Sequence, residues 1–229
     1  MKIAGLQRVS LIDYPGKITA TVFTQGCNFA CPYCHNPDLV DPGINVVCLP
    51  EEEIYSYLEK RRGKLEAVTI TGGEPTIQSD LALFAGRVKA MGYLVKLDTN
   101  GSQPAALEQL LAAKLLDYIA MDIKAPLHKY PAVTQTPISD EAIRQSIKII
   151  KSAGIDYEFR TTVVKSQLSP ADLLEIGRLV APAPLYALQR FVPAKLLNKE
   201  FINQTTLSPE EFAATKILLE EKIKKVIIR

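Results

Sequence analysis

Three cysteines in the segment GCNFACPYCHN have a type and spacing that could support metal chemistry. Cys27, Cys31 and Cys34 follow the pattern C-x3-C-x2-C. Three thiolates can bind three irons of a [4Fe–4S] cluster, whereas a structural cluster normally takes four cysteines. The pattern therefore predicts a cluster with one iron that has no protein ligand, which is free to bind a reacting molecule.

Other uses of these cysteines must be weighed against an iron–sulfur cluster. Cys31 and Cys34 form a C-x-x-C pair of the kind found in thiol–disulfide exchange, and with His35 they match the C-x-x-C-H signature of haem attachment. Cys3His coordination of zinc is a further alternative. Haem attachment would need an export signal, which we do not expect here, and neither haem nor thiol exchange uses Cys27. Zinc would require the adjacent Cys34 and His35 to point at one ion.

A second motif, Gly72-Gly73-Glu74-Pro75, follows a predicted strand about 40 residues downstream. Paired glycines let the backbone approach a ligand closely. Alone this segment would be interpreted as an ordinary turn between a strand and a helix. Together with the cysteine pattern it becomes specific, and the two motifs together favour iron–sulfur chemistry over zinc, thiol exchange or haem.

Short β-rich segments alternate with longer helical patterns along the chain. Strands are predicted at 17–24, 66–71, 93–98, 117–122, 157–164 and 185–191, and helices at 51–61, 80–91, 104–114, 139–153, 170–180 and 209–225. Repeated strand–helix–strand units predict parallel strands with right-handed crossovers. We therefore expect one α/β domain over residues 1–229, as an open, partial barrel of six units or as a doubly wound sheet.

Polar residues gather where the predicted strands end, which in both architectures is where ligands bind. The cysteines follow the first strand and the glycine motif follows the second. Strand 157–164 carries polar side chains at alternate positions, which share one face. The remaining candidates at these ends are Asp98, Thr99, Asp122, Lys124, Glu158, Arg160, Thr162, Gln189 and Arg190.

Composition limits the classes of function. The chain has 229 residues, 47% of them hydrophobic, and a net charge of +2. It can bury a sizeable core, and neither nucleic acid nor a membrane is an expected partner. We expect a cytoplasmic protein, where cysteines bind metal more often than they form disulfides. The fourth cysteine, Cys48, is predicted to be a buried, inert thiol. Residues 125–137 are predicted to form a loop, and the basic residues 222–229 a solvated helix end.

These motifs resemble those of the radical S-adenosylmethionine (SAM) enzymes, which carry C-x3-C-x-aromatic-C followed by a GGEP-like segment. The resemblance covers nearly the whole chain and implies a partial (β/α)6 barrel with parallel strands. Within that superfamily the chain is similar to the activating enzymes of glycyl radical proteins at 13–16 (DYPG), 34–36 (CHN), 98–101 (DTNG) and 122–124 (DIK). The opening LIDYPG and the short length are most similar to activating proteins of anaerobic ribonucleoside-triphosphate reductase.

The resemblance also implies roles for individual residues. Cys27, Cys31 and Cys34 would hold one [4Fe–4S] cluster, because only Cys48 lies outside the motif. The residues expected to contact SAM are Tyr33 at the adenine, Gly72, Gly73 and Glu74 at the ammonium group, and Asp98 and Lys124 at the ribose and carboxylate. Asp98, Thr99 and Asp122 match positions that hold a monovalent cation in a related activase. Asp13 would meet the glycine loop of the partner, and His35 could tune the cluster.

The implied activity is reductive cleavage of SAM to a 5′-deoxyadenosyl radical, which takes a hydrogen atom from a glycine of the partner enzyme. Flavodoxin or ferredoxin would supply the electron. Anaerobic ribonucleotide reductase is the expected partner. The alternatives are a pyruvate formate-lyase-type partner, or the same chemistry on a small molecule or an RNA base.

Overall fold

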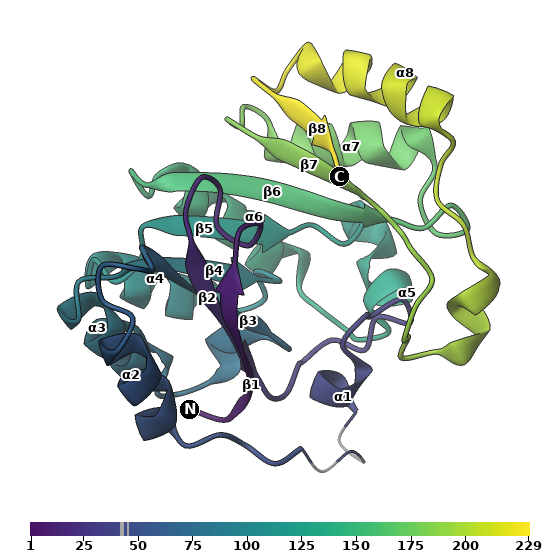
Figure 1. Cartoon of the computed structure of the whole chain (residues 1–229). Helices are drawn as coiled ribbons and strands as arrows, with labels where there is room; N and C mark the ends of the chain where they lie inside the picture. Colours follow the sequence, from purple (N-terminus) through teal and green to yellow (C-terminus); the bar gives the residue numbers. More distant parts are fainter. Residues whose placement is uncertain (42–43, 45) are drawn as a thin grey trace.

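A single sheet of eight strands forms the framework of the protein within residues 1–41, 44 and 46–229, which the computed structural model describes (Figure 1). The strands are β1 (Ile3–Ser10), β2 (Thr19–Thr24), β3 (Ala67–Gly72), β4 (Leu94–Thr99), β5 (Tyr118–Asp122), β6 (Asp156–Val163), β7 (Tyr186–Arg190) and β8 (Val226–Ile228). The α-helices are α1 (Pro37–Val40), α2 (Glu51–Glu59), α3 (Leu81–Ala90), α4 (Pro104–Ala112), α5 (Tyr130–Thr134), α6 (Asp140–Lys151), α7 (Pro170–Val180) and α8 (Pro209–Glu220). Short 3-10 helices are η1 (Pro75–Ile77), η2 (Leu127–Lys129) and η3 (Lys199–Asn203).

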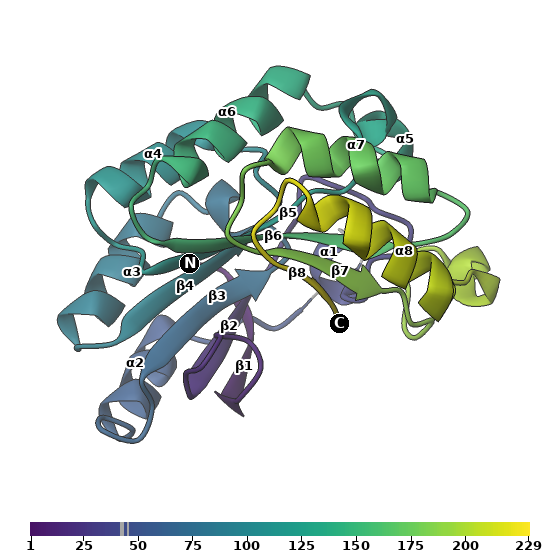
Figure 2. The same cartoon turned by 90° about the horizontal axis from the view of Figure 1, so that it is seen from above.

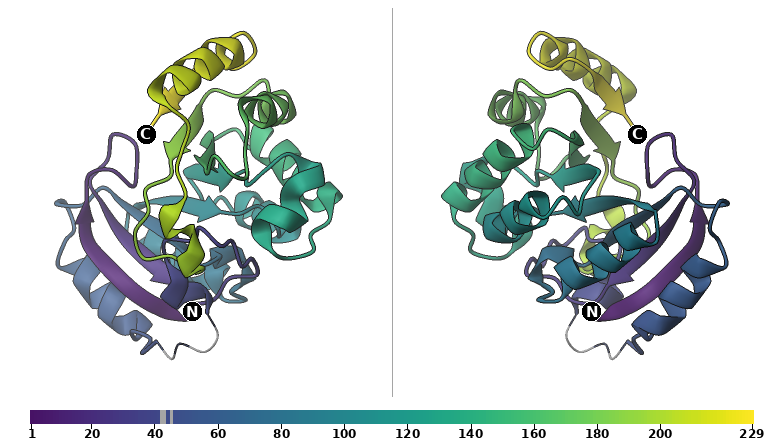
Figure 3. Two further views of the ribbon diagram at one scale, coloured as in Figure 1. Left: turned by 90° about the vertical axis from the view of Figure 1, so that its right-hand side faces the viewer. Right: turned by 90° about the vertical axis from the view of Figure 1, so that its left-hand side faces the viewer.

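The strands lie in the sheet in the order of the sequence, from β1 to β8. The strands from β2 to β8 are parallel, and β1 pairs antiparallel with β2. A doubly wound sheet reverses its strand order, so this alternative is wrong. The sheet is curved, and β1 and β8 form its two unjoined edges (Figure 3). The expected partial barrel with parallel strands is therefore confirmed.

Helices cover the convex face of the sheet, and Figure 2 shows α3, α4, α6, α7 and α8 along this side. The residues that point outward from the strands are apolar and fully buried, among them Val95, Leu97, Ile119, Met121 and Phe159. Side chains alternate between the faces of a strand, so the intervening positions face inward. Among the described residues no helix is both long enough and apolar enough to cross a bilayer.

The concave face of the sheet is unusually polar for a buried surface. Thr19 and Thr69 lie side by side, with their hydroxyl oxygens 3.2 Å apart. The connection between β1 and β2 places Tyr14 against Tyr118, with ring centroids 5.5 Å apart, and these two rings pack with Ala67 and Ala120 in a small apolar cluster. The cluster closes the inner face at the end where the parallel strands begin, and the charged side chains lie beyond it.

The structure corrects the sequence predictions at both ends of the chain. Strand β1 was not predicted, because Gly5, Gln7 and Arg8 interrupt any regular alternation. Helix α8 ends at Glu220, and the basic tail is not a solvated helix end: it forms β8, and Arg229 donates to the buried Glu158 at 2.8 and 3.0 Å. Part of the predicted loop 125–137 is helical, in η2 and α5.

Candidate active site

A cavity of about 250 Å³ opens where the parallel strands end. Its lining combines the cysteine loop after β2 with residues that follow or end β3, β4, β5, β6 and β7. The lining residues are Cys27, Phe29, Cys31, Tyr33, Cys34, His35, Asn36, Val40, Thr71, Gly72, Gly73, Glu74, Asp98, Thr99, Asn100, Asp122, Lys124, Arg160, Thr162 and Gln189. All the residues predicted to bind the cluster, SAM or a cation are in this set.

The cysteine loop presents three free thiols to the cavity. Cys31 is buried, Cys27 and Cys34 are half-buried, and the Cys34 amide closes a turn onto the Cys31 carbonyl at 3.0 Å. Burial raises the pKa of Cys27 to about 12 and also raises the pKa of Cys31. Thiols ligate iron as thiolates, so a bound metal must displace these protons. Three sulfur donors on one short loop fit the three-cysteine ligation of a [4Fe–4S] cluster.

A second segment of the chain covers the cysteine loop. The amide of Leu197 donates to the Cys34 carbonyl at 3.2 Å, and the amide of Asn198 donates to the Pro32 carbonyl at 3.0 Å. The His35 Nε2 lies 2.9 Å from the Val192 carbonyl, which can only accept a hydrogen bond, so Nε2 is the protonated nitrogen. The loop is thus held by main-chain contacts from the segment that follows β7.

The two glycines of the GGEP motif have a packing role that the sequence did not indicate. A Cβ atom on Gly73 would lie 1.9 Å from the carbonyl oxygen of Gly26, and one on Gly72 would lie 2.3 Å from the amide nitrogen of Thr24. The Glu74 amide also donates to Gly26 at 2.9 Å. The missing side chains let the loop after β3 lie directly against the turn that carries Cys27.

Glu74 ties the end of β3 to the end of β4. Its carboxylate accepts hydrogen bonds from the Thr76 amide at 3.0 Å, the Thr99 hydroxyl at 2.8 Å and the Asn100 amide at 2.6 Å. Burial raises the pKa of Glu74, and these donors partly offset that effect. The Thr99 hydroxyl therefore points to Glu74 and not to the other two residues predicted to hold a cation with it.

A line of alternating charges crosses the inner face of β4, β5 and β6. Asp98 pairs with Lys96 and, at 3.1 Å, with Arg160. Arg160 also pairs with Asp122 at 2.7 Å, and Asp122 with Lys124 at 3.1 Å. Burial opposes ionisation of both aspartates, but the neighbouring cations outweigh it, and the pKa of each carboxyl lies below its usual range. The cavity floor is therefore ionised at neutral pH.

Strand register explains why these charges meet. Asp122 lies opposite Arg160 in the pairing of β5 with β6, and Asp98 lies opposite Ala120 in the pairing of β4 with β5. Ala120 is small, so the guanidinium of Arg160 can reach across β5 to Asp98. Arg160 was a candidate at the strand ends without an assigned role, and Lys96 was not predicted as a site residue. The alternation along 157–164 was the available signal for Arg160, whereas Lys96 gave no signal beyond its strand.

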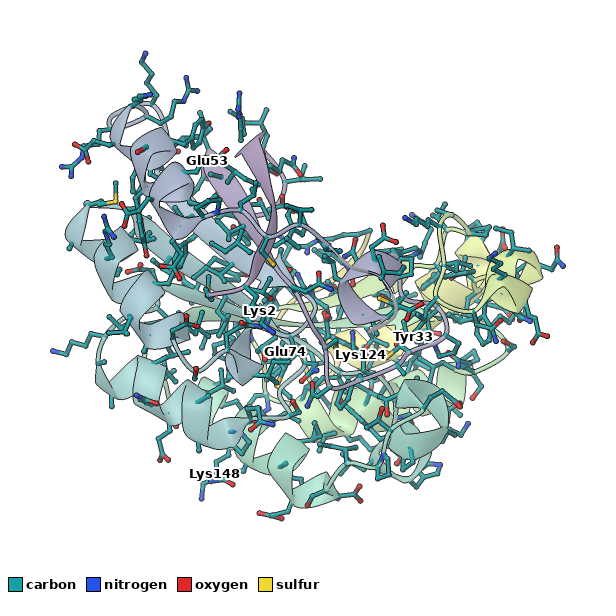
Figure 4. The ribbon with its side chains drawn as sticks, turned by 90° about the horizontal axis from the view of Figure 1, so that it is seen from below. Lys2, Tyr33, Glu53, Glu74, Lys124 and Lys148 are labelled. Atoms are coloured by element: carbon teal, nitrogen blue, oxygen red, sulfur yellow. The ribbon has the colours of Figure 1, made fainter. Side chains whose placement is uncertain are left out.

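Tyr33, Lys124 and Glu74 all line the cavity, and Figure 4 labels these three side chains in the central part of the molecule. The Tyr33 hydroxyl is buried without a hydrogen-bond partner among the described residues. Burial beside the Cys31 thiol raises its pKa well above the usual value. A buried hydroxyl with no partner at the rim of a cavity fits a site that takes a polar ligand.

Asp13 and Cys48 lie outside the cavity lining, as do the strand-end candidates Glu158 and Arg190. Asp13 is in the connection between β1 and β2, at the opposite end of β2 from the cysteines, and accepts a hydrogen bond from the Thr21 hydroxyl at 2.7 Å. Its contact with a partner stays a prediction. Cys48 is exposed, so the expected buried thiol is wrong. It precedes Leu49, which forms an isolated bridge with Ile3 at the edge of the sheet.

Comparisons with known proteins agree with this site. A sequence profile of the radical SAM superfamily matches residues 21–180. A putative glycyl-radical enzyme activating enzyme of Methanocaldococcus jannaschii is 34% identical over 99% of this chain and 95% of its own length. The pyruvate formate-lyase-activating enzyme of Listeria monocytogenes is 31% identical over 54% of this chain and 53% of its own length.

The fold has matches among solved structures. Streptococcus suis SuiB bound to its precursor peptide SuiA superposes with a TM-score of 0.68 over 90% of this chain and 47% of SuiB, at 12% identity. At this identity the likeness concerns the fold alone. The sequence matches, the open parallel sheet and the three thiols at its strand ends agree. The chain therefore belongs to the radical SAM superfamily, whose members use a [4Fe–4S] cluster and SAM, and within it to the glycyl-radical enzyme activating enzymes.

Proposed function

We propose that this protein activates anaerobic ribonucleoside-triphosphate reductase in the cytoplasm, by removing a hydrogen atom from a glycine of that enzyme. The observation that carries the proposal is the cavity in which three thiols face an ionised floor of Asp98, Asp122, Lys124 and Arg160. The LIDYPG opening and the absence of further clustered cysteines in the sequence favour the reductase as partner. The whole chain would act as one domain, with flavodoxin or ferredoxin as electron donor.

The residues of the cavity have distinct tasks in this proposal. Cys27, Cys31 and Cys34 would hold the cluster, and the cluster and SAM, when bound, supply the radical chemistry. Main-chain groups around Gly73 and Glu74 would bind the ammonium group of SAM. Lys124 offers an ammonium group to the SAM carboxylate, and Asp98 offers carboxylate oxygens to the ribose hydroxyls.

The cavity also restricts the geometry of the reaction. The loop that holds Cys27 and the loop that holds Glu74 are bonded to each other, so a cluster and a SAM molecule held by them would keep a fixed separation. Fixed orientation of reacting groups is a major contribution of a protein to catalysis. The open edge between β1 and β8 leaves the concave side accessible to a glycine loop.

Electron paramagnetic resonance tests the proposed partner. The reduced protein and SAM are mixed without oxygen with anaerobic ribonucleotide reductase, with pyruvate formate-lyase, or with no partner. We expect a glycyl doublet with the reductase and none with a reductase variant whose radical glycine is replaced by alanine. A doublet with pyruvate formate-lyase alone would overturn the choice of partner. SAM cleavage that needs only a small molecule would overturn the whole proposal.

Glu74 provides a second test. In Glu74→Ala the donors of Thr76, Thr99 and Asn100 lose a buried acceptor, which costs about 1–3 kcal/mol in comparable cases. We expect SAM binding to weaken by roughly tenfold, as measured by equilibrium dialysis, while iron and sulfide content stay at the wild-type level. Glu52→Ala, on the exposed surface of α2, is the control and should change neither quantity. Loss of iron with normal SAM affinity would show that the loop after β3 serves the cluster instead.

A further inference from the structure

A buried lysine, Lys96, contacts the cavity-lining Asp98 from outside the lining itself, at a position where the sequence gave no reason to expect a site residue. Lys96 is 2% exposed and points inward from the middle of β4. Its ammonium group contacts Asp98 and lies 5.8 Å from the centre of the Tyr118 ring. Burying an unpaired ammonium group costs free energy, and the ion pair with Asp98 offsets this cost.

The oxygens of both floor aspartates are occupied by side chains of the protein. Lys96 contacts Asp98 Oδ1, and Arg160 donates to Asp98 Oδ2 at 3.1 Å. Arg160 Nε donates to Asp122 Oδ1 at 2.7 Å, and Lys124 Nζ donates to Asp122 Oδ2 at 3.1 Å. Each of the four carboxylate oxygens therefore already has a cationic partner, so a bound metal ion would add positive charge where two carboxylates already pair with three protein cations.

Thr99, the third residue predicted to hold a monovalent cation, is directed elsewhere. Its hydroxyl donates to Glu74 at 2.8 Å, and it accepts the Gly101 amide at 3.1 Å. The three predicted ligands line one cavity, but the Thr99 hydroxyl is not directed at the two carboxylates. The two carboxylates of the predicted cation site are Asp98 and Asp122. Their negative charge is already balanced by the three neighbouring cations, Lys96, Arg160 and Lys124.

We propose that the Lys96 ammonium is a built-in cation of this site, and that SAM binding consequently needs no monovalent metal ion. An ammonium is a compact single charge, similar in this respect to a potassium ion. Carried on a rigid strand, it neutralises and orients Asp98 without a separate binding step. Lys96 is thus a positioning residue, which acts on SAM through Asp98, and this inference rests on the proposed function.

The first experiment uses the wild-type protein, reconstituted without oxygen. SAM affinity and the thermal midpoint are measured at constant ionic strength with tetramethylammonium, sodium, potassium or ammonium as the only monovalent cation. Tetramethylammonium is too large to enter a carboxylate site. We expect both quantities to be the same in all four salts, within about twofold for affinity. A requirement for sodium or potassium in the wild type would overturn the proposal.

The second experiment removes the ammonium. In Lys96→Met a side chain of similar length leaves Asp98 Oδ1 without its partner and leaves room for a small cation. We expect about tenfold weaker SAM binding in tetramethylammonium, recovered by ammonium or potassium, and a thermal midpoint that rises with the same ions. Lys89→Met is the matched control, because Lys89 pairs with Asp117 outside the cavity, and it should acquire no salt response.

The outcomes separate this inference from the proposed function. Wild-type SAM affinity in the variant, or a loss that no cation recovers, would overturn the role of Lys96. If Lys96→Met does not fold, Lys96→Arg is used in its place, because it keeps the positive charge in a group of different shape. The comparison of salts with the wild-type protein then still decides whether SAM binding needs a metal ion. Absence of a glycyl signal with any partner would leave these binding results unchanged. Failure to bind SAM in every salt would instead contradict the proposed function, while the thermal midpoints still report on the cation.

Discussion

Replacing Cys31 by alanine is expected to abolish SAM cleavage. Cys31 is the most buried of the three thiols, and its loss would leave two cysteines, too few to hold the cluster. The free energy of unfolding should fall by only about 1 kcal/mol, because a single small side chain is removed from the core, so the fold should survive the substitution. The measurements are iron and sulfide content, the visible absorption of the reconstituted protein and the yield of 5′-deoxyadenosine.

Cys48→Ala is the matched control for this substitution. Cys48 is exposed and lies outside the cavity lining, so its removal should leave iron content and SAM cleavage at the wild-type level. Normal SAM cleavage by Cys31→Ala would be fatal to the assignment of the cluster ligands. Loss of the cluster in Cys48→Ala would show that a fourth sulfur takes part.

Replacing Arg160 by leucine should cause the largest loss of stability among the substitutions considered. Arg160 is paired with both Asp98 and Asp122, and its side chain is only 12% exposed. Removing one partner of a buried ion pair typically costs about 3–5 kcal/mol, because a charge remains buried without compensation. We expect about 3 kcal/mol, the lower end of this range, since Lys96 and Lys124 remain and Asp122 is partly exposed. Urea unfolding at neutral pH measures the difference.

The pH dependence of this loss identifies its cause. The pKa of Asp98 and that of Asp122 lie below their usual range in the folded protein, so their ion pairs stabilise it above about pH 4 and lose this effect as the pH falls. The stability difference between wild type and Arg160→Leu should therefore be largest at neutral pH and shrink below about pH 4. A difference that stays constant with pH would assign the loss to packing. Arg62→Leu, an exposed residue paired with Glu59, should change nothing measurable.

The strand and helix pattern was predictable wherever side chains follow a clear period. The six predicted parallel strands exist, within two residues at their starts, because each is a short β-rich segment with a clear pattern of side chains. Strand β1 was missed because its sequence has no alternation, and β8 because three residues at the end of a basic tail carry too little information. β1 pairs with β2, the next strand in the chain, whereas β8 pairs with β7, from which helix α8 separates it in the sequence.

The site likewise contains features that local sequence motifs predict and features that depend on contacts between distant segments. The cysteine loop and the GGEP segment are local motifs, and their side chains do meet at one cavity. The contact of Arg160 with Asp98 could not be predicted, because it depends on the register of three strands and on the small side chain of Ala120 between them. The packing of Gly73 against Gly26 likewise depends on two loops that are distant in the sequence.

The sequence by itself determined which donors this protein has: three closely spaced thiols, a glycine pair and acidic and basic residues at the strand ends. Only the tertiary structure decided how their charges are balanced. It turned Lys96 inward to Asp98 and directed Thr99 to Glu74. The physical reason is that the face a side chain occupies follows from its own strand, whereas its partner is set by the register of neighbouring strands and by the space their side chains leave.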